Sequence, residues 1–149
     1  MVQEQEEDQI REVAMDLDDA IESRNIEQIV SFFADDCEIE LMGVTLSGKD
    51  GARKWLEWLF ETLVEIKLEP VIIMVDGNAF FEEFILIGTL PNGKTVKSKQ
   101  SEVLIYENYK IKSLRLYFDR LDFADVVAEG IISRRIVKTL IARSLRGLL

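Results

Sequence analysis

Four consecutive segments in the second half of the chain have the pattern of β-strands, and the short turns between them leave few possible folds. We predict these strands at about 66–75, 79–90, 94–107 and 110–119. Turn-forming residues separate them, at Asp76-Gly77-Asn78, Pro91-Asn92-Gly93 and Asn108-Tyr109. Strands joined by turns this short must pair with their sequence neighbours in antiparallel fashion. The sequence therefore predicts an antiparallel meander over this half of the chain.

The first half has the 3.6-residue period of amphipathic helices. One helix is predicted over 5–24 and a second over 26–34, with Asn25 as its cap. A short strand is predicted at Cys37–Met42, and a third helix begins after Ser47-Gly48. Helices followed by an antiparallel sheet indicate an α+β fold. At 149 residues, we expect one domain spanning 1–149.

The residue types exclude several kinds of site. The chain has no histidine and a single cysteine, Cys37, which we expect to be a small buried residue. Imidazole catalysis, an internal disulfide and a cysteine-based metal cluster are thereby excluded. Asp16, Asp18 and Asp19 are expected to be solvated helix positions, so the sequence predicts no metal site and no cofactor. Any catalysis has to use carboxylates, Tyr, Lys, Arg or Cys37.

The net charge of −10 is unevenly distributed along the chain. Residues 131–149 hold five of the 18 cationic side chains and no acid, so the other 13 cations share the rest of the chain with all 28 acids. An acidic body disfavours nucleic acid as a partner. The acidic start, MVQEQEEDQI, differs from a signal peptide, and no apolar run is long enough to span a membrane. We therefore expect a cytoplasmic protein.

A last amphipathic helix is predicted over 131–147. Its basic side chains lie on one side and its apolar side chains fill a broad arc on the other, at Ile132, Ile136, Val137, Leu140, Ile141 and Leu148. Such a helix is expected to dock on its own domain or on a partner subunit. The alternative is a helix that lies on a membrane surface, because it has the basic polar face of such helices.

Four segments, taken in order, carry a resemblance to a known superfamily. They are IEQIVSFFADDCEIE, LSGKDGARKWLEWLF, TLPNGKT and KIKSLRLYFDRLDF. Together they resemble the nuclear transport factor 2-like superfamily, which includes ketosteroid isomerases, limonene-1,2-epoxide hydrolases and SnoaL-type polyketide cyclases. The resemblance covers about 8–126. It implies a cone, in which a curved sheet wraps around three helices and encloses an apolar pocket, usually in a homodimer.

The catalytic positions of that superfamily are mostly not kept. Leu17 and Leu41 stand where the isomerases have a hydrogen-bonding Tyr and a general-base Asp, whereas Glu102 stands at the position of their oxyanion-stabilising Asp. The epoxide hydrolases have a catalytic Asp-Arg-Asp set and a Tyr and an Asn that hold the attacking water. None of these five is retained, because their positions are occupied here by Ile85, Glu83, Leu116, Ile39 and Leu41. The resemblance therefore predicts a scaffold and not a reaction.

Two acids are expected to meet in the pocket. If Asn92-Gly93 is a two-residue turn, Glu83 pairs directly with Glu102, and paired residues share one face of a sheet. The resemblance points this face into the cone, whereas a one-residue bulge would turn one acid outward. The other residues predicted to line the pocket are Leu17, Leu41, Trp55, Ile85, Gln100, Leu104 and Leu116.

Two adjacent carboxyls in apolar surroundings should share a proton near neutral pH, because burial and mutual repulsion both raise the carboxyl pKa. One would then serve as general base and the other as general acid. This predicts an isomerase, cyclase or lyase that acts on an apolar carbonyl compound through Glu83 and Glu102. The alternative is a ligand-binding or dimeric assembly module without chemistry.

The same alternation of strand residues predicts a dimer surface. With Glu83 inside, Phe80, Phe84 and Leu86 fall on the outer face of the sheet. An apolar outer face of this kind is typical of a homodimer interface, to which the C-terminal helix could also contribute.

Overall fold

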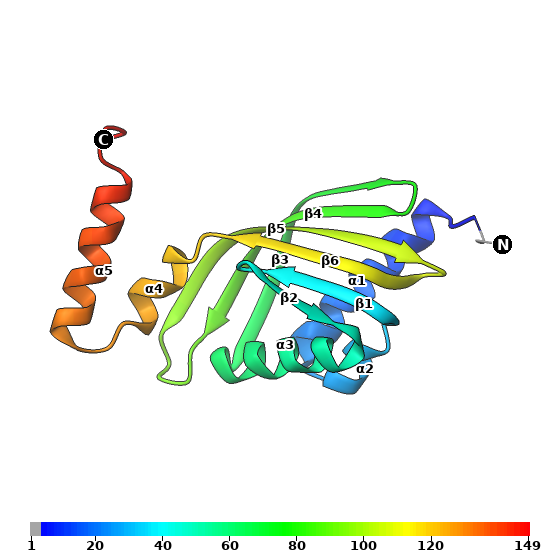
Figure 1. The fold of residues 1–149 in the computed structure, drawn as a ribbon, viewed down its shortest axis with the longest axis horizontal. Coiled ribbons are helices and arrows are strands. Elements are labelled where there is room, and N and C mark those ends of the chain that lie inside the picture. Colours follow the sequence, from blue (N-terminus) through cyan, green and yellow to red (C-terminus); the bar gives the residue numbers. More distant parts are fainter. Residues whose placement is uncertain (1–3) are drawn as a thin grey trace.

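The computed structural model describes residues 4–149 and contains a mixed α+β fold with a curved, unclosed sheet (Figure 1). The helices among these residues are α1 (Glu7–Ser23), α2 (Ile26–Val30), α3 (Gly48–Thr62), α4 (Leu121–Val127) and α5 (Gly130–Ser144). The strands are β1 (Phe33–Leu41), β2 (Val44–Ser47), β3 (Glu65–Asp76), β4 (Ala79–Thr89), β5 (Thr95–Glu107) and β6 (Lys110–Phe118).

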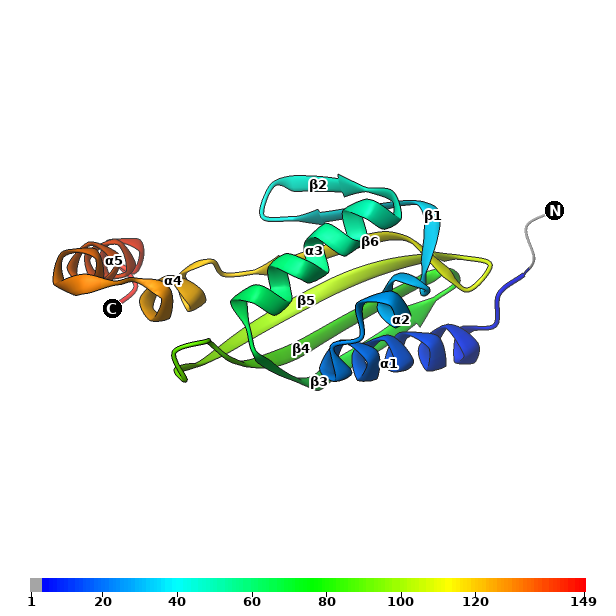
Figure 2. The ribbon, with the colours of Figure 1, turned by 90° about the horizontal axis from the view of Figure 1, so that it is seen from below.

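The sheet has the strand order β2-β1-β6-β5-β4-β3. Strands β3 to β6 form the predicted antiparallel meander, and β1 joins β6 in parallel. Helices α1, α2 and α3 lie together on one face of the curved sheet, as Figure 2 shows. The predicted cone of a curved sheet around three helices is confirmed.

The local structure of the first half follows the sequence closely. Asn25 caps α2, and its side chain accepts a hydrogen bond from the backbone N–H of Gln28 at 3.1 Å. Helix α2 ends earlier than predicted because the chain from Phe33 onward pairs with β6. Strand β2 was not predicted. It follows a two-residue turn in which Met42 and Gly43 both have positive φ, and Met42 is an unusual residue for such a turn.

The register of the β4–β5 hairpin differs from the predicted one. Its loop has three residues, Pro91 to Gly93, closed by a hydrogen bond from the Leu90 N–H to the Lys94 carbonyl at 2.8 Å. Gly93 has a φ of 83°, so the loop is of the kind that ends in a left-handed glycine. Glu102 consequently pairs with Glu82, and Glu83 pairs with Ser101.

This shift by one residue reverses the two faces of β4, because strand side chains alternate. Phe80, Phe84 and Leu86, predicted on the outer face, are buried on the inner face. Glu83 and Ile85, predicted in the pocket, lie on the outer face. The predicted pair of Glu83 and Glu102 and the predicted dimer surface on Phe80, Phe84 and Leu86 are therefore wrong.

Helix α5 stands apart from the body and is joined to it through α4 (Figure 1). None of its residues is buried, and most of its apolar side chains are exposed, with Ile131 and Ile132 at 73% and 76%. The helix was expected to dock on its own domain or on a partner subunit. Docking on its own domain is wrong, and docking on a partner subunit stays a prediction. Among the helices of residues 4–149, none has the length and apolar character to cross a membrane.

Candidate functional site

An apolar cavity of about 260 Å³ lies between α3, α4 and the inner face of the sheet. Aromatic side chains form much of its wall, at Trp55, Trp58, Phe84, Phe118 and Phe123. Its polar lining is confined to a few groups, of which Asp18, Gln100 and Glu102 are buried. An apolar cavity with a few convergent polar groups is the usual form of a small-molecule site.

Three carboxyl groups form a buried cluster beside this cavity, and two of them, Asp18 and Glu102, belong to its lining. Asp18 comes from the buried face of α1, and Glu82 and Glu102 are direct partners on β4 and β5. Carboxylate oxygens of all three lie within 4.8 Å of one another. The exposed fractions are 8%, 1% and 7%. These acids are therefore buried together, which is rare for carboxyl groups without a cationic partner.

Burial and mutual repulsion make these acids hard to ionise. Desolvation is the main cause in each case, and it raises the pKa of Glu82 to about 7 and that of Glu102 to about 8. The pKa of Asp18 rises to about 9, because the charges of Glu82 and Glu102 add to desolvation. Hydrogen bonding with Asp18 acts against this rise in the pKa of Glu82. The cluster holds both ionised and protonated carboxyls near neutral pH.

Several polar atoms around the cluster have no hydrogen-bond partner among the described residues. They are Glu82 Oε1, the Tyr106 hydroxyl and the indole N–H of Trp55, all of them buried. Desolvation, followed by the charges of Glu102, Asp18 and Glu82, raises the pKa of the Tyr106 hydroxyl, so this phenol stays protonated. Buried polar atoms are normally paired, and unpaired ones at a cavity are typical of a site that binds a ligand or water.

The three carboxyls are also spaced closely enough to act as cation ligands. A hard cation such as Ca²⁺ takes about six to eight oxygen ligands. The aromatic and aliphatic side chains that form most of the wall supply none. The arrangement suits proton transfer and hydrogen bonding better than metal binding.

Helix α4 covers one side of the cavity. The Ser98 hydroxyl donates a hydrogen bond to the Asp122 carboxylate at 2.8 Å, which ties α4 to β5. The rings of Phe118 and Phe123 pack edge to face with centroids 5.4 Å apart. Arg120, the cationic residue in this lining, donates to the Met42 carbonyl. The cavity wall therefore includes a segment that is attached by a few contacts only.

The structure places the predicted site residues in three groups. Trp55, Gln100, Glu102 and Leu116 line the cavity. Leu17, Leu41 and Leu104 are buried in the core without lining it. Glu83 and Ile85 are on the outer face of the sheet, as described above.

Sequence reasoning missed Asp18 and Glu82. Asp18 was expected to be solvated, yet it is only 8% exposed. The signal was its spacing, since Asp18 is four residues after Ala14 and three before Ile21, both on the apolar stripe of α1. Glu82 would have been found if Pro91 to Gly93 had been treated as a three-residue loop.

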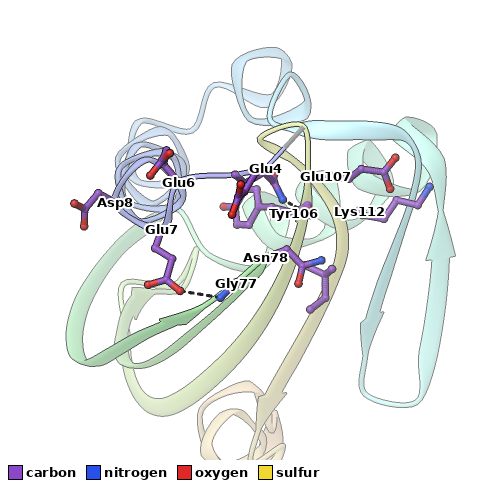
Figure 3. Close-up of a pocket in the computed structure, with 11 residues that line it drawn as sticks. Glu4, Glu6, Glu7, Asp8, Gly77, Asn78, Tyr106, Glu107 and Lys112 are labelled. Atoms are coloured by element: carbon purple, nitrogen blue, oxygen red, sulfur yellow. Dashed lines mark hydrogen bonds between the residues drawn. The ribbon is translucent and has the colours of Figure 1, made fainter. Parts of the chain in front are cut away.

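A second and more open hollow lies at the N-terminal end of α1 (Figure 3). The segment before α1 and the first turn of α1 close it, since Gln5 Nε2 donates to the Tyr106 carbonyl at 3.0 Å and Glu7 accepts from the Gly77 N–H at 2.9 Å. The acids in its lining are all exposed. It lacks the buried acids of the apolar cavity, which is therefore the better candidate site.

The comparisons with known proteins agree with the fold. The family model of the SnoaL-like domain matches residues 15–114, a span that includes Asp18, Glu82 and Glu102. No curated protein matches the chain in sequence.

Solved structures of low sequence identity share the architecture. A putative SnoaL-like polyketide cyclase from Jannaschia sp. CCS1 is 15% identical, with a TM-score of 0.75 over 87% of this chain and 99% of its own. An NTF2-like protein of unknown function from Burkholderia pseudomallei is 16% identical, with a TM-score of 0.74 over 80% and 98%.

A third structure is SalBIII, an epoxide hydrolase/cyclase-like enzyme with a role in pyran ring formation in the polyether salinomycin. It is 20% identical, with a TM-score of 0.71 over 78% of this chain and 95% of its own. The family match and the shared cone together show that this chain belongs to the SnoaL-like domain family of the nuclear transport factor 2-like superfamily.

Proposed function

We propose that this protein binds an apolar carbonyl compound in the cavity and moves protons on it with the buried carboxyls, as an isomerase, cyclase or lyase. The observation that supports this most directly is the buried cluster of Asp18, Glu82 and Glu102, of which Asp18 and Glu102 line the apolar cavity. Carboxyls with a pKa near neutrality can give and take protons at physiological pH, which is the requirement for general acid–base catalysis.

The position of each acid relative to the cavity assigns its role. One carboxyl of the hydrogen-bonded pair of Asp18 and Glu82 is ionised, and the pair takes a proton from the carbon next to the carbonyl through Asp18, which lines the cavity. Glu102, which is still largely protonated, donates a hydrogen bond to the carbonyl oxygen as charge develops there. Glu82 holds Asp18 in place through their hydrogen bond. The unpartnered indole N–H of Trp55 is a second donor for an oxygen of the substrate.

The relatives are consistent with this class of reaction. SalBIII is described as epoxide hydrolase/cyclase-like, and the Jannaschia protein as a putative polyketide cyclase. Both descriptions concern small organic molecules whose rings are closed or opened. At these identities the likeness supports a small-molecule site on the same scaffold and leaves the substrate open.

A second candidate function is a ligand-binding or dimeric assembly module without chemistry. Leu17, Leu41 and Leu116 favour it, because apolar side chains stand at positions where the resembled enzymes have catalytic groups. In this case the carboxyl cluster would bind a ligand and transfer no proton to or from carbon.

Hydrogen–deuterium exchange separates the two functions. A panel of apolar ketones is first tested for binding by the shift in thermal unfolding, and the ketones that bind are then incubated with the protein in D₂O. We expect wild type to catalyse deuterium uptake at the carbon next to the carbonyl, as measured by NMR. Glu82→Gln should reduce this rate by about 10²–10⁴-fold, the usual contribution of a general base.

Glu83→Gln is the matched control, because Glu83 is the adjacent acid on the same strand but lies on the outer face. Its exchange rate should equal that of wild type. Equal exchange in wild type and Glu82→Gln would contradict the catalytic role of the pair of Asp18 and Glu82. Ketones that bind without any exchange would favour the binding module.

A further inference from the structure

The aromatic-walled cavity adjoins a cluster of three buried acids, two of which line it, and no basic side chain of the described residues forms an ion pair with these acids. The salt bridges of residues 4–149 involve Lys49, Arg53, Lys67 and Lys112, all with other acids. Arg120 lines the cavity, but its guanidinium is directed to the Met42 carbonyl. Residues 4–149 therefore supply no ion-pair partner to balance the acid cluster, although buried carboxylates are normally paired.

Unpartnered oxygen atoms give independent support for a missing donor. Glu82 Oε1 is buried and accepts no hydrogen bond, and Glu82 is 1% exposed. The Tyr106 hydroxyl is also unpartnered, on a side chain 1% exposed, and it lies close enough to all three acids to sense their charges. Both oxygens can accept a hydrogen bond, so they require a group that brings several donors.

We propose that the ligand of this cavity is a small apolar molecule with a primary ammonium group, and that the ammonium binds between Asp18, Glu82 and Glu102. An ammonium has three N–H donors and no acceptor, which matches a cluster of three carboxyls in which Glu82 Oε1 is unpaired. Its apolar part lies against Trp55, Phe84 and Phe118, and aromatic faces also attract cations. The cavity volume of about 260 Å³ suits a ligand of about one ring with a short arm.

This inference rests on the proposed function only in that the cavity holds a small molecule, and it adds the charge of that molecule. The two are chemically compatible. A bound cation lowers the pKa of the carboxyls around it. A second carboxyl then ionises and becomes available as a base, while the first stays paired with the ammonium. Binding should therefore release protons from the cluster.

The charges that face the cluster favour a cation over an anion. Glu22 and Asp19 on α1 add further negative charge near Asp18, and Glu82 and Glu102 face it from the sheet. A divalent metal ion is the competing cation. The mostly apolar wall of the cavity provides few of the additional oxygen ligands that such an ion needs.

Three probes of nearly the same shape test the proposal, namely 2-phenylethylammonium, 2-phenylethanol and 3-phenylpropionate. Isothermal titration calorimetry at pH 7.5 measures their affinities, and a second buffer with a different ionisation enthalpy reports the protons released. We expect the ammonium to bind about ten- to a hundredfold more tightly than the alcohol, which is the range for a charged hydrogen bond. The carboxylate should bind most weakly.

The variants locate the effect. Glu82→Gln should reduce the affinity for the ammonium about tenfold or more and leave that for the alcohol unchanged, whereas Glu83→Gln on the outer face should change neither. Glu102→Gln is the second variant, used if Glu82→Gln does not fold. Equal affinities of ammonium and alcohol overturn the proposal, as does a folded wild type that binds no ammonium.

Two further results distinguish the possible failures. If Mg²⁺, Ca²⁺ or Mn²⁺ binds through Glu82 and the ammonium does not, the cluster is a metal site and the proposal is overturned. The other result is that neutral ketones bind and exchange deuterium while the ammonium binds no more tightly than the alcohol. In that case this inference fails and the proposed proton transfer stands.

Discussion

The carboxyl group of Glu102 is surrounded by apolar side chains and by two other acids, and these neighbours determine how the protein responds to pH. Desolvation and the charge of Glu82 raise its pKa to about 8, and the pKa values of Glu82 and Asp18 rise to about 7 and about 9. In the unfolded chain these groups lose their protons at about pH 4. The folded state therefore binds more protons than the unfolded state between about pH 4 and 9.

This difference predicts the sign of the pH dependence of stability. The stabilising contribution of the three acids is complete below about pH 4 and is lost as the pH rises through their raised pKa values. We expect the free energy of unfolding to fall from pH 5 to pH 9, as measured by urea denaturation. In proteins whose carboxylates are paired with cations, the free energy of unfolding instead rises as the pH increases through the acid range.

Glu102→Gln tests the origin of this loss. The amide cannot ionise, so the variant should be more stable than wild type at pH 8 to 9, by about 1–3 kcal/mol, and its stability should vary less with pH. Glu83→Gln controls for the general effect of removing one negative charge from an acidic protein. If both variants change the stability equally at all pH values, the buried position of Glu102 has no special effect.

At this scale the sequence identified one of the three acids. Glu102 was expected inside because of its position in the resemblance, and it does line the cavity. Asp18 was not expected inside, because an acid within a charged helix is usually solvated. Its burial depends on the approach of β4 and β5 to α1, which a helical pattern alone does not reveal.

Among the elements, the loop between β4 and β5 has the largest effect on the site. The dipeptide Asn92-Gly93 favours a two-residue turn, but the chain forms a three-residue loop that includes Pro91. The strands themselves were predicted to within a few residues, because their alternation is a local property. The register of β4 and β5 was not predicted, because it changes when the loop between them has three residues instead of two.

Helix α5 is expected to contribute little to the stability of the rest of the fold. None of its residues is buried and it adjoins α4, so removal of residues 129–149 should leave the thermal unfolding midpoint of the body nearly unchanged. Differential scanning calorimetry measures this midpoint. A large drop would show that the apolar arc of α5 is covered by the protein itself in solution.

At the scale of the whole molecule, the outer face of the sheet and α5 both expose apolar side chains to solvent. Met74, Phe81 and Val103 form a row across β3, β4 and β5 on the outer face, and Met74 is 55% exposed. This row replaces the wrongly predicted surface of Phe80, Phe84 and Leu86. We propose that it forms the interface of a homodimer, because apolar rows on a solvent-facing sheet are typical of subunit contacts.

The oligomeric state tests this proposal. Light scattering coupled to size exclusion should give twice the mass of the chain for wild type, and Phe81→Glu should give the mass of a monomer, because a charge in the middle of an apolar interface is not solvated. Lys97→Glu, at the exposed end of the same sheet, is the control and should remain dimeric. A monomeric wild type would refute this interface.

The sequence alone determined helices α1, α2, α3 and α5, the strands of the meander, the α+β class and the superfamily. These follow from periods of 3.6 and two residues and from turn residues, which act over short distances along the chain. Tertiary structure alone decided which face of β4 is inside, that Asp18 joins Glu82 and Glu102, and that α5 stands free of the body. These features depend on a loop conformation and on packing between distant segments, so a local signal such as the spacing of Asp18 on the apolar stripe of α1 does not decide them by itself.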